Sequence, residues 1–128
     1  GFIYSVGMSP ANTAAALAAI QALKVQPELV ENLHARAKLF LELAQKYQLN
    51  TGYSQNTPII PIIIGDSLKC IKLSQLLFRR GINVQPMIYP SVPEKMARLR
   101  FFISSKHTEE QIHLTLNALV QELENLQK

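Results

Sequence analysis

Apolar residues recur every three or four positions in two long segments, which predicts two amphipathic helices. The first begins at Pro27 and runs through the apolar positions of residues 29–47, and the polar residues 50–52 are expected to end it. The second begins at Thr108, where Gln111 three residues later predicts a capping box that pairs each side chain with the other's backbone amide. The buried stripe of this last helix is expected to comprise Ile112, Leu116, Leu119, Leu123 and Leu126.

Two further helices are indicated by capping residues. Ser9 and Pro10 are typical of a helix start, and the alanine-rich residues 11–23 follow. Because this helix carries small side chains on nearly every face, we expect it to pack closely against other elements, some of them outside this chain. Another helix is expected to begin at Asp66 or Ser67 and to end before a glycine at the C′ position. Gly81 would be that glycine, and the apolar stripe of the helix would be Leu68, Ile71, Leu76 and Phe78.

Three strands complete the expected order of elements. Residues 59–64 are β-branched, although Pro61 should confine them to a sheet edge or a bulge. Residues 82–88 and 97–104 are the other two strands, separated by the proline-stiffened connector 89–93. The order helix, helix, strand, helix, strand, strand, helix indicates the α+β class, with a small, mostly antiparallel three-stranded sheet and helices on one face.

Composition narrows the functional classes. At 128 residues, one domain is the default, and a single cysteine excludes a disulfide framework and multi-cysteine zinc sites while suiting a reducing cytoplasm. The net charge of +4 is not clustered, so neither the charge nor any motif favours nucleic-acid binding. The longest apolar run, residues 59–64, is far shorter than the ~20 residues of a membrane span. Without an initiator methionine or a signal-like start, the chain is expected to begin inside a longer protein.

The last predicted strand carries the most informative polar pattern. Side chains alternate faces along a strand, so Arg98 and Arg100 should share one face while Leu99, Phe101 and Ile103 point to the other. Two interpretations remain open from the pattern. The arginines either face water, or they form a clamp for a carboxylate or phosphate, for which the planar guanidinium fork is suited.

Other reactive residues make no complete active site. His34, His107 and His113 are scattered, with no ligand spacing for a metal, and His107 is expected to form a local hydrogen bond. Cys70 lies among apolar helical residues and is interpreted as part of the core. No catalytic residue and no metal site is therefore assigned within this chain.

Five segments, in one order, resemble a single family: residues 2–11, 81–84, 89–93, 97–100 and 104–108. They resemble the C-terminal part of the α-oxoamine synthases, the fold-type-I pyridoxal-phosphate enzymes that include 8-amino-7-oxononanoate synthase, 2-amino-3-ketobutyrate CoA ligase, 5-aminolevulinate synthase and serine palmitoyltransferase. The resemblance implies that residues 1–26 end a large domain and provide a bridging helix. Residues 27–128 would then be the C-terminal small domain.

The resemblance also implies roles for individual residues. In that family an amino acid and an acyl-CoA condense, and pyridoxal 5'-phosphate acts as an electron sink. By resemblance, Arg100 binds the substrate carboxylate, with Arg98 and Tyr89 as further substrate-site candidates. The segment with Ser5, Val6 and Gly7 resembles the stretch that reaches the cofactor phosphate of the neighbouring subunit of a homodimer.

Two departures and one omission qualify the resemblance. Val6 stands where several members have a second hydroxyl residue, and Ile88 stands where oxononanoate synthases carry an arginine. Tyr89-Pro90 is more like the ketobutyrate ligase and aminolevulinate synthase pattern, which leaves the acyl donor open. The family's Schiff-base lysine belongs to a preceding segment that this chain lacks, so the chain alone is expected to be inactive.

Three other functions remain open at this stage. A fold-type-I aminotransferase also binds its substrate carboxylate through a C-terminal-domain arginine. An autonomous αβ module that binds a small anion through the arginines is the second, and a dimerisation domain without a ligand is the third. A larger parent with the missing lysine would favour the enzyme.

Overall fold

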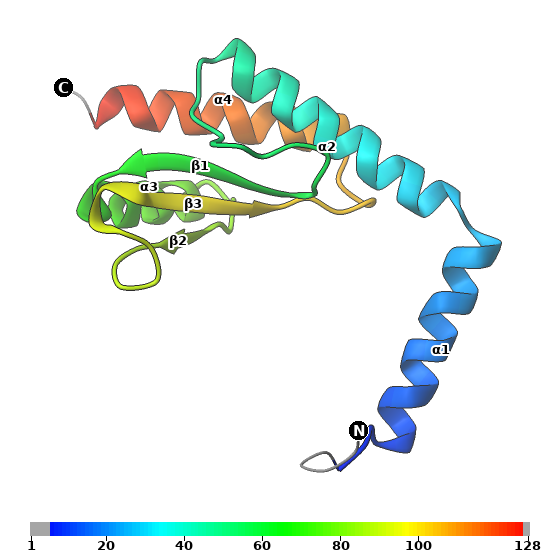
Figure 1. Ribbon diagram of the computed structural model, residues 1–128. Coiled ribbons are helices and arrows are strands. Elements are labelled where there is room, and N and C mark those ends of the chain that lie inside the picture. The colour runs from blue at the N-terminus through cyan, green and yellow to red at the C-terminus, as the bar shows by residue number, and fades with distance from the viewer. Residues whose placement is uncertain (1–5, 127–128) are drawn as a thin grey trace.

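The computed structural model describes residues 6–126, which form four α-helices, a three-stranded sheet and one 3₁₀ turn (Figure 1). In chain order the elements are α1 (Pro10–Val25), α2 (Glu28–Lys46), β1 (Ile59–Gly65), α3 (Ser67–Arg79), β2 (Gln85–Met87), the 3₁₀ turn (Glu94–Met96), β3 (Ala97–Phe102) and α4 (Glu109–Asn125). The predicted α+β class and the predicted order of elements are confirmed.

The sheet has the order β1-β3-β2, and both pairs of neighbours are antiparallel. β1 is therefore an edge strand, as Pro61 predicts: proline has no amide to donate, and an edge strand has positions whose amides are not needed for pairing. The β1–β3 register also shifts between Ile63 and Gly65. β3 is the central strand, so its side chains decide what each face of the sheet carries.

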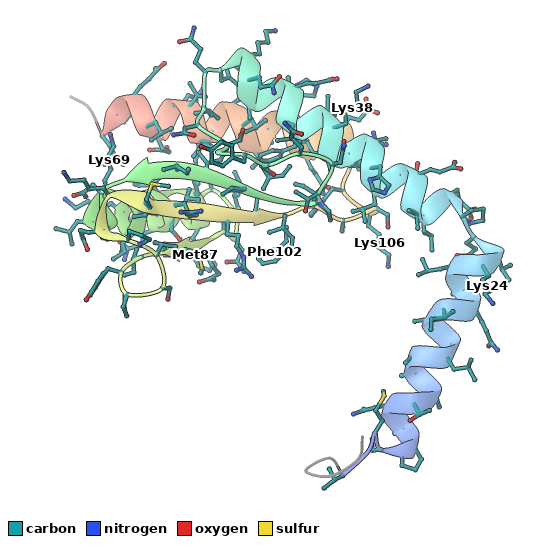
Figure 2. All side chains as sticks on the ribbon, in the orientation of Figure 1. Lys24, Lys38, Lys69, Met87, Phe102 and Lys106 are labelled. Atoms are coloured by element: carbon teal, nitrogen blue, oxygen red, sulfur yellow. The ribbon has the colours of Figure 1, made fainter. Side chains whose placement is uncertain are left out.

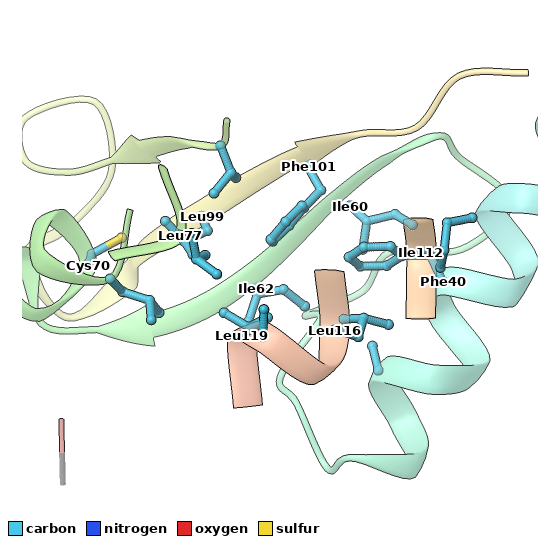
Figure 3. Packing of buried hydrophobic residues seen from close by; sticks show 14 of the residues in the cluster. Phe40, Ile60, Ile62, Cys70, Leu77, Leu99, Phe101, Ile112, Leu116 and Leu119 are labelled. Atoms are coloured by element: carbon cyan, nitrogen blue, oxygen red, sulfur yellow. The ribbon is translucent and has the colours of Figure 1, made fainter. Parts of the chain in front are cut away.

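Helices α2, α3 and α4 cover one face of the sheet, and the core lies between them and the strands (Figures 1 and 3). Phe40 of α2 packs against Phe101 of β3, with ring centroids 5.0 Å apart. Other buried residues come from β1, β3 and the three helices. They include Ile60, Ile62, Cys70, Leu73, Leu77, Ala97, Leu99, Leu116 and Leu119. The expectation of helices on one face is confirmed.

Helix α1 differs from the other three helices because none of its residues is buried. It projects away from the layered part of the molecule (Figure 1). The helix begins as predicted, since the Ser9 side chain accepts a hydrogen bond from the Asn12 amide at 3.3 Å. Leu17, Ile20 and Leu23 are exposed, and the expectation that this helix packs against other elements, some of them outside this chain, stays a prediction.

The predicted start of α4 is confirmed in full. The Gln111 amide donates to the Thr108 hydroxyl at 3.1 Å, and the Thr108 amide donates to the Gln111 side-chain oxygen at 3.0 Å. At α3, Asp66 rather than Ser67 is the cap, and its carboxylate accepts from the Lys69 amide at 2.6 Å. These caps fix the ends of α3 and α4 nearest the strands that precede them.

The end of α2 was predicted wrongly. The helix stops at Lys46 rather than at residues 50–52. Gln48 takes a left-handed conformation with φ 56°, and the amides of Gln48 and Leu49 donate to the carbonyls of Gln45 and Ala44, both at 2.9 Å. This is a Schellman motif, which usually has glycine at that position, so a glutamine there gave no sequence signal.

The second and third strands are shorter than predicted. β2 covers Gln85–Met87 instead of residues 82–88, because the Ile82 amide donates to the Leu77 carbonyl at 3.0 Å and belongs to the C-terminal cap of α3. Gly81 occupies the C′ position of that cap with φ 80°, as expected. β3 ends at Phe102 instead of residue 104.

The predicted apolar stripe of α3 is also corrected. Leu68 and Phe78 are 70% and 66% exposed, whereas the buried residues are Cys70, Leu73 and Leu77. The buried set has the spacing of three and four that one helix face requires, which the predicted set lacks. The assignment of Cys70 to the core is confirmed.

Leu99→Ala should destabilise the chain by about 3–5 kcal/mol, because Leu99 is fully buried at the centre of β3 and its truncation leaves a cavity. Leu68→Ala is the matched control, since it removes the same atoms from an exposed helical position and should cost less than about 1 kcal/mol. Urea unfolding monitored by circular dichroism measures both. Equal losses for the two variants would contradict the assigned core.

Candidate functional site

The face of the sheet away from α2 and α4 is defined by the alternation along β3. In the register, Pro61 and Gln85 flank Arg100, while Ile63 and Met87 flank Arg98. Antiparallel partners point to the same side of a sheet, so these residues share a face. Met87 and Phe102 can be seen on that side in Figure 2. The prediction that Arg98 and Arg100 share one face opposite Leu99 and Phe101 is confirmed.

The two arginines are held differently. The Arg98 Nε donates to the Met96 carbonyl at 2.9 Å, which ties this side chain to the backbone just before β3. The Arg100 guanidinium carbon lies 4.7 Å from the centre of the Phe102 ring. Within residues 6–126, the Arg100 side chain has no hydrogen bond and no ion pair. Its donors are therefore available to a ligand.

Two of the other arginines in the described chain, Arg36 and Arg80, have carboxylate partners, whereas Arg79 and Arg98 have none. Arg36 pairs with Glu109, and Arg80 pairs with Glu122 at 3.3 Å. These pairs join helices that pack on the far side of the sheet, and they explain those residues structurally. Arg100 has no comparable structural partner in residues 6–126, so its charge is not used to hold the fold together.

A groove of about 610 Å³ lies beside Arg100. Arg100 and Phe102 line it, together with the chain that enters β2 and the first turns of α4. Its walls include Ile82, Gln85, Ile103, His107, Glu110 and Leu114. Arg98 does not line this groove. The structure thus distinguishes two arginines that the sequence pattern leaves equivalent.

Tyr89 is 64% exposed and precedes Pro90 through a cis peptide bond. It follows Met87 by two residues, and Met87 is the register partner of Arg98. The connector that carries Tyr89 therefore leaves the sheet at the Arg98 end. Among the three predicted substrate-site residues, the sheet brings Arg98 and Arg100 together, whereas Tyr89 is not placed beside Arg100.

The predicted cofactor-binding segment lies elsewhere. Ser5 lies outside the described residues. Val6 is fully exposed, and Gly7 has φ 73° with no atom within 4 Å of the position that a Cβ would take. Both precede α1, whose N-terminal end is remote from the sheet (Figure 1). The structure therefore does not bring Val6 or Gly7 to Arg100 within one chain.

The residues present fit part of a pyridoxal-phosphate site. A Cβ at Gly7 would meet no atom within 4 Å, so there is room for an anion beside that backbone, and the Arg100 guanidinium has no hydrogen bond or ion pair within residues 6–126. The three strands contain no lysine, and the lysines labelled in Figure 2 lie on α1, α2, α3 and the segment before α4. The strands themselves thus carry two guanidinium groups and no amine on the arginine face.

Histidine and cysteine have structural roles here. The His107 Nδ1 accepts a hydrogen bond from the Ser104 amide at 3.0 Å, which is the local bond that was expected. In the described part of the chain, no three His, Cys, Asp or Glu residues are grouped as metal ligands require.

No helix within residues 6–126 has the length and apolarity to cross a membrane.

Two residues of this face, Phe102 and Gln85, were not singled out from the sequence. Phe102 could have been found, because it lies two residues after Arg100 and so must share its face. Gln85 is opposite Arg100 through the pairing of β2 with β3. No local pattern in the sequence gives that register.

The chain belongs to the aminotransferase class I and II family, whose model matches residues 1–119. Among curated proteins, it is 40% identical to the 8-amino-7-oxononanoate synthase of Treponema denticola over 111 residues, which cover 87% of this chain and 28% of the relative. It is also 40% identical to the enzyme of the same name from Pseudomonas putida over 127 residues, which cover 97% of this chain and 32% of the relative. The chain therefore spans about a third of the length of these relatives.

Solved structures agree with that relationship. The crystal structure of 8-amino-7-oxononanoate synthase from Francisella tularensis has a TM-score of 0.82 and 26% identity, and the match covers 99% of this chain and 37% of that one. A serine palmitoyltransferase structure with pyridoxal phosphate has a TM-score of 0.86 at 21% identity, covering 98% of this chain and 32% of that one, and shows the shared fold. The resemblance to the α-oxoamine synthases is confirmed.

Burial raises the pKa of the Cys70 thiol to about 11 from its ordinary value of 9.0. The thiolate is disfavoured in the folded chain, so the unfolded chain releases its proton first as the pH rises. The stability associated with this thiol should be complete below pH 9 and should be lost between pH 9 and 11, with a decrease of about 1 kcal/mol between pH 8 and pH 10. Cys70→Ala should abolish that difference in urea titrations at the two pH values. An identical pH dependence in both proteins would contradict it.

Proposed function

We propose that the protein containing this chain is a pyridoxal-phosphate-dependent acyl-CoA:amino-acid C-acyltransferase of the α-oxoamine synthase type. In this proposal, the chain is its C-terminal small domain and provides Arg100 to bind the carboxylate of the amino acid. The observation that carries the proposal is the Arg100 guanidinium, which lines a groove between β3, the chain that enters β2 and the first turns of α4, and which has no hydrogen bond or ion pair within residues 6–126. The relatives named 8-amino-7-oxononanoate synthase support the reaction class.

The contribution of Arg100 is orientation. A guanidinium edge donates two parallel hydrogen bonds to a carboxylate, so it fixes both the position and the plane of that group. Fixing the carboxylate also limits which bond at the Cα atom stands perpendicular to the cofactor ring, and such alignment lowers the barrier. The cofactor, when bound, supplies the electron sink for the carbanion at Cα. Arg100 itself takes no proton at any step.

Arg98 is proposed to act indirectly. Because its Nε is occupied by the Met96 carbonyl, it has fewer donors for a ligand than Arg100. Its positive charge on the same face still favours the approach of an anion. We therefore assign Arg98 a weaker part in substrate binding, and Tyr89 is a candidate contact at the Arg98 end of the face.

The N-terminal segment is proposed to serve a second subunit of a homodimer. The space beside Gly7, where a Cβ would meet no atom within 4 Å, suits the approach of the cofactor phosphate, with Ser5 and Val6 as neighbours. Its separation from Arg100 within one chain supports a role at the other subunit's cofactor. The wholly exposed α1 supports the proposal that residues 1–26 pack on another domain, and that residues 27–128 are the small domain.

The isolated chain is proposed to be inactive, because the lysine that would hold the cofactor lies in another part of the protein. The substrates are proposed to be an amino acid and an acyl thioester. Ile88 and Tyr89 leave the acyl donor open, although the relatives' names favour that of 8-amino-7-oxononanoate synthase. The buried, unpaired Cys70 supports a cytoplasmic location.

A second candidate is an ordinary aminotransferase, which the description of the matching family favours. That reaction needs the same carboxylate contact, so Arg100 does not separate the two functions. The products do. Release of free CoA with an amino ketone identifies the acyltransferase, whereas formation of a new amino acid from a keto acid identifies the aminotransferase.

Arg100→Ala in the full-length enzyme should raise the KM for the amino acid and lower kcat/KM by about 30-fold to 5,000-fold, which corresponds to about 2–5 kcal/mol. The loss is large because the substrate carboxylate is left without its partner. Arg98→Ala is the matched control on the same strand and should have a smaller effect. Steady-state kinetics for each substrate in turn measure these changes. Wild-type kinetics for the Arg100 variant would refute the assignment.

A further inference from the structure

Phe102 is a large apolar side chain that is 52% exposed on the open face of the sheet. It follows Arg100 by two residues on β3, and its register partner is Ile59 at the start of β1. A half-exposed phenyl ring contributes less to the core than a buried one, and the core of this sheet lies on the opposite face. Stability of the fold therefore does not account for an aromatic residue here.

The contact between Phe102 and Arg100 does account for it. The guanidinium carbon is 4.7 Å from the ring centre, within the range of a cation–π interaction. The ring engages the guanidinium by its π face, and none of the N–H donors of Arg100 is used in a hydrogen bond within residues 6–126. The donors stay available for a planar partner such as a carboxylate.

Other ways of holding an arginine would consume what a ligand needs. A carboxylate partner, as Glu122 is for Arg80, compensates the charge and occupies donors. A backbone tether, as the Met96 carbonyl is for Arg98, occupies Nε. The aromatic contact limits the motion of the guanidinium while leaving both its charge and its donors free.

The neighbours of Arg100 across the sheet do not perform this task. Gln85 is its register partner on β2, but the Gln85 Nε2 donates to the Asn83 side-chain oxygen at 3.3 Å. Pro61, the partner on β1, has an aliphatic ring without donors. Among the described residues, Phe102 is the aromatic side chain that contacts the Arg100 guanidinium.

We propose that Phe102 is a positioning residue, which orients the Arg100 guanidinium so that it binds the substrate carboxylate. The inference rests on the proposed function of Arg100. Phe102 also lines the groove beside Arg100 and so limits the directions from which water reaches that side chain. The ring acts through Arg100 and needs no contact with the substrate.

The test is Phe102→Leu in the full-length enzyme, because leucine keeps an apolar side chain but has no π face. The KM for the amino acid should rise about threefold to fivefold, which is the size expected for a partly exposed cation–π contact. The KM for the acyl thioester should stay unchanged. Phe102→Tyr keeps the aromatic face and should retain the wild-type KM for the amino acid.

Two controls separate positioning from a general structural effect. Phe78→Leu makes the same change at a similarly exposed phenylalanine on α3 and should leave both KM values unchanged. In an Arg100→Ala background, Phe102→Leu should have no further effect on the KM for the amino acid, because the side chain that it orients is missing.

The outcomes distinguish this inference from the proposed function. If Arg100→Ala raises the KM for the amino acid but Phe102→Leu does not, the positioning role is wrong and the function of Arg100 stands. Independent, additive effects of the two substitutions would also overturn the positioning role. If Arg100→Ala itself has wild-type kinetics, the proposed function is wrong.

Discussion

The alternation of side chains along β3 is the constraint on which the rest of the structure depends. β3 is the central strand, so both edge strands take their register from it. A slip of one residue would turn Leu99 and Phe101 out of the core and turn Arg98 and Arg100 into it. Burying two guanidinium groups without partners would cost far more than any single core contact contributes. The hydrophobic core therefore fixes which way the arginines point.

This arrangement separates the residues that stabilise the fold from the residues available to a ligand. The charged groups that hold helices together are paired, as Arg36 is with Glu109 and Arg80 with Glu122. Arg100 is held by a ring and a strand that the core already fixes in place. Its donors thus remain free, and the Phe102 ring contacts the guanidinium on one side. Pre-orientation of this kind reduces the entropy that a ligand would otherwise lose on binding.

Local rules predicted the features that have local causes. The capping box at Thr108, the edge position of Pro61 and the opposite faces of Leu99 and Arg100 all follow from residues within a few positions of one another. The prediction of where α2 ends failed, because Gln48 rather than glycine takes the left-handed position. The conformational cost of a non-glycine residue there must be offset by the surrounding packing. The prediction of the buried face of α3 also failed, because tertiary packing decides which side of this helix meets the sheet.

The candidate site, like the fold, was predictable only where local alternation along one strand decides it. Alternation alone places Phe102 beside Arg100, but the difference between the two arginines depends on the Met96 carbonyl and on the groove formed with α4. These contacts join segments that are distant or irregular, so no periodicity reports them. The resemblance to known enzymes selected Arg100 over Arg98, whereas the structure supplies the physical difference between them.

In the proposed function, the chemistry of Arg100 separates the orientation of a substrate from the choice among substrates. A guanidinium fork binds the carboxylate that all α-amino acids share, and it makes no distinction among their side chains. Selectivity requires contacts with the parts that differ, for which an apolar wall is suited. Ile82, Ile103 and Leu114 line the same groove as Arg100 and give it such a wall. Under the proposed function, orientation of the carboxylate therefore falls to β3, and selectivity falls to the segments that line the groove around it.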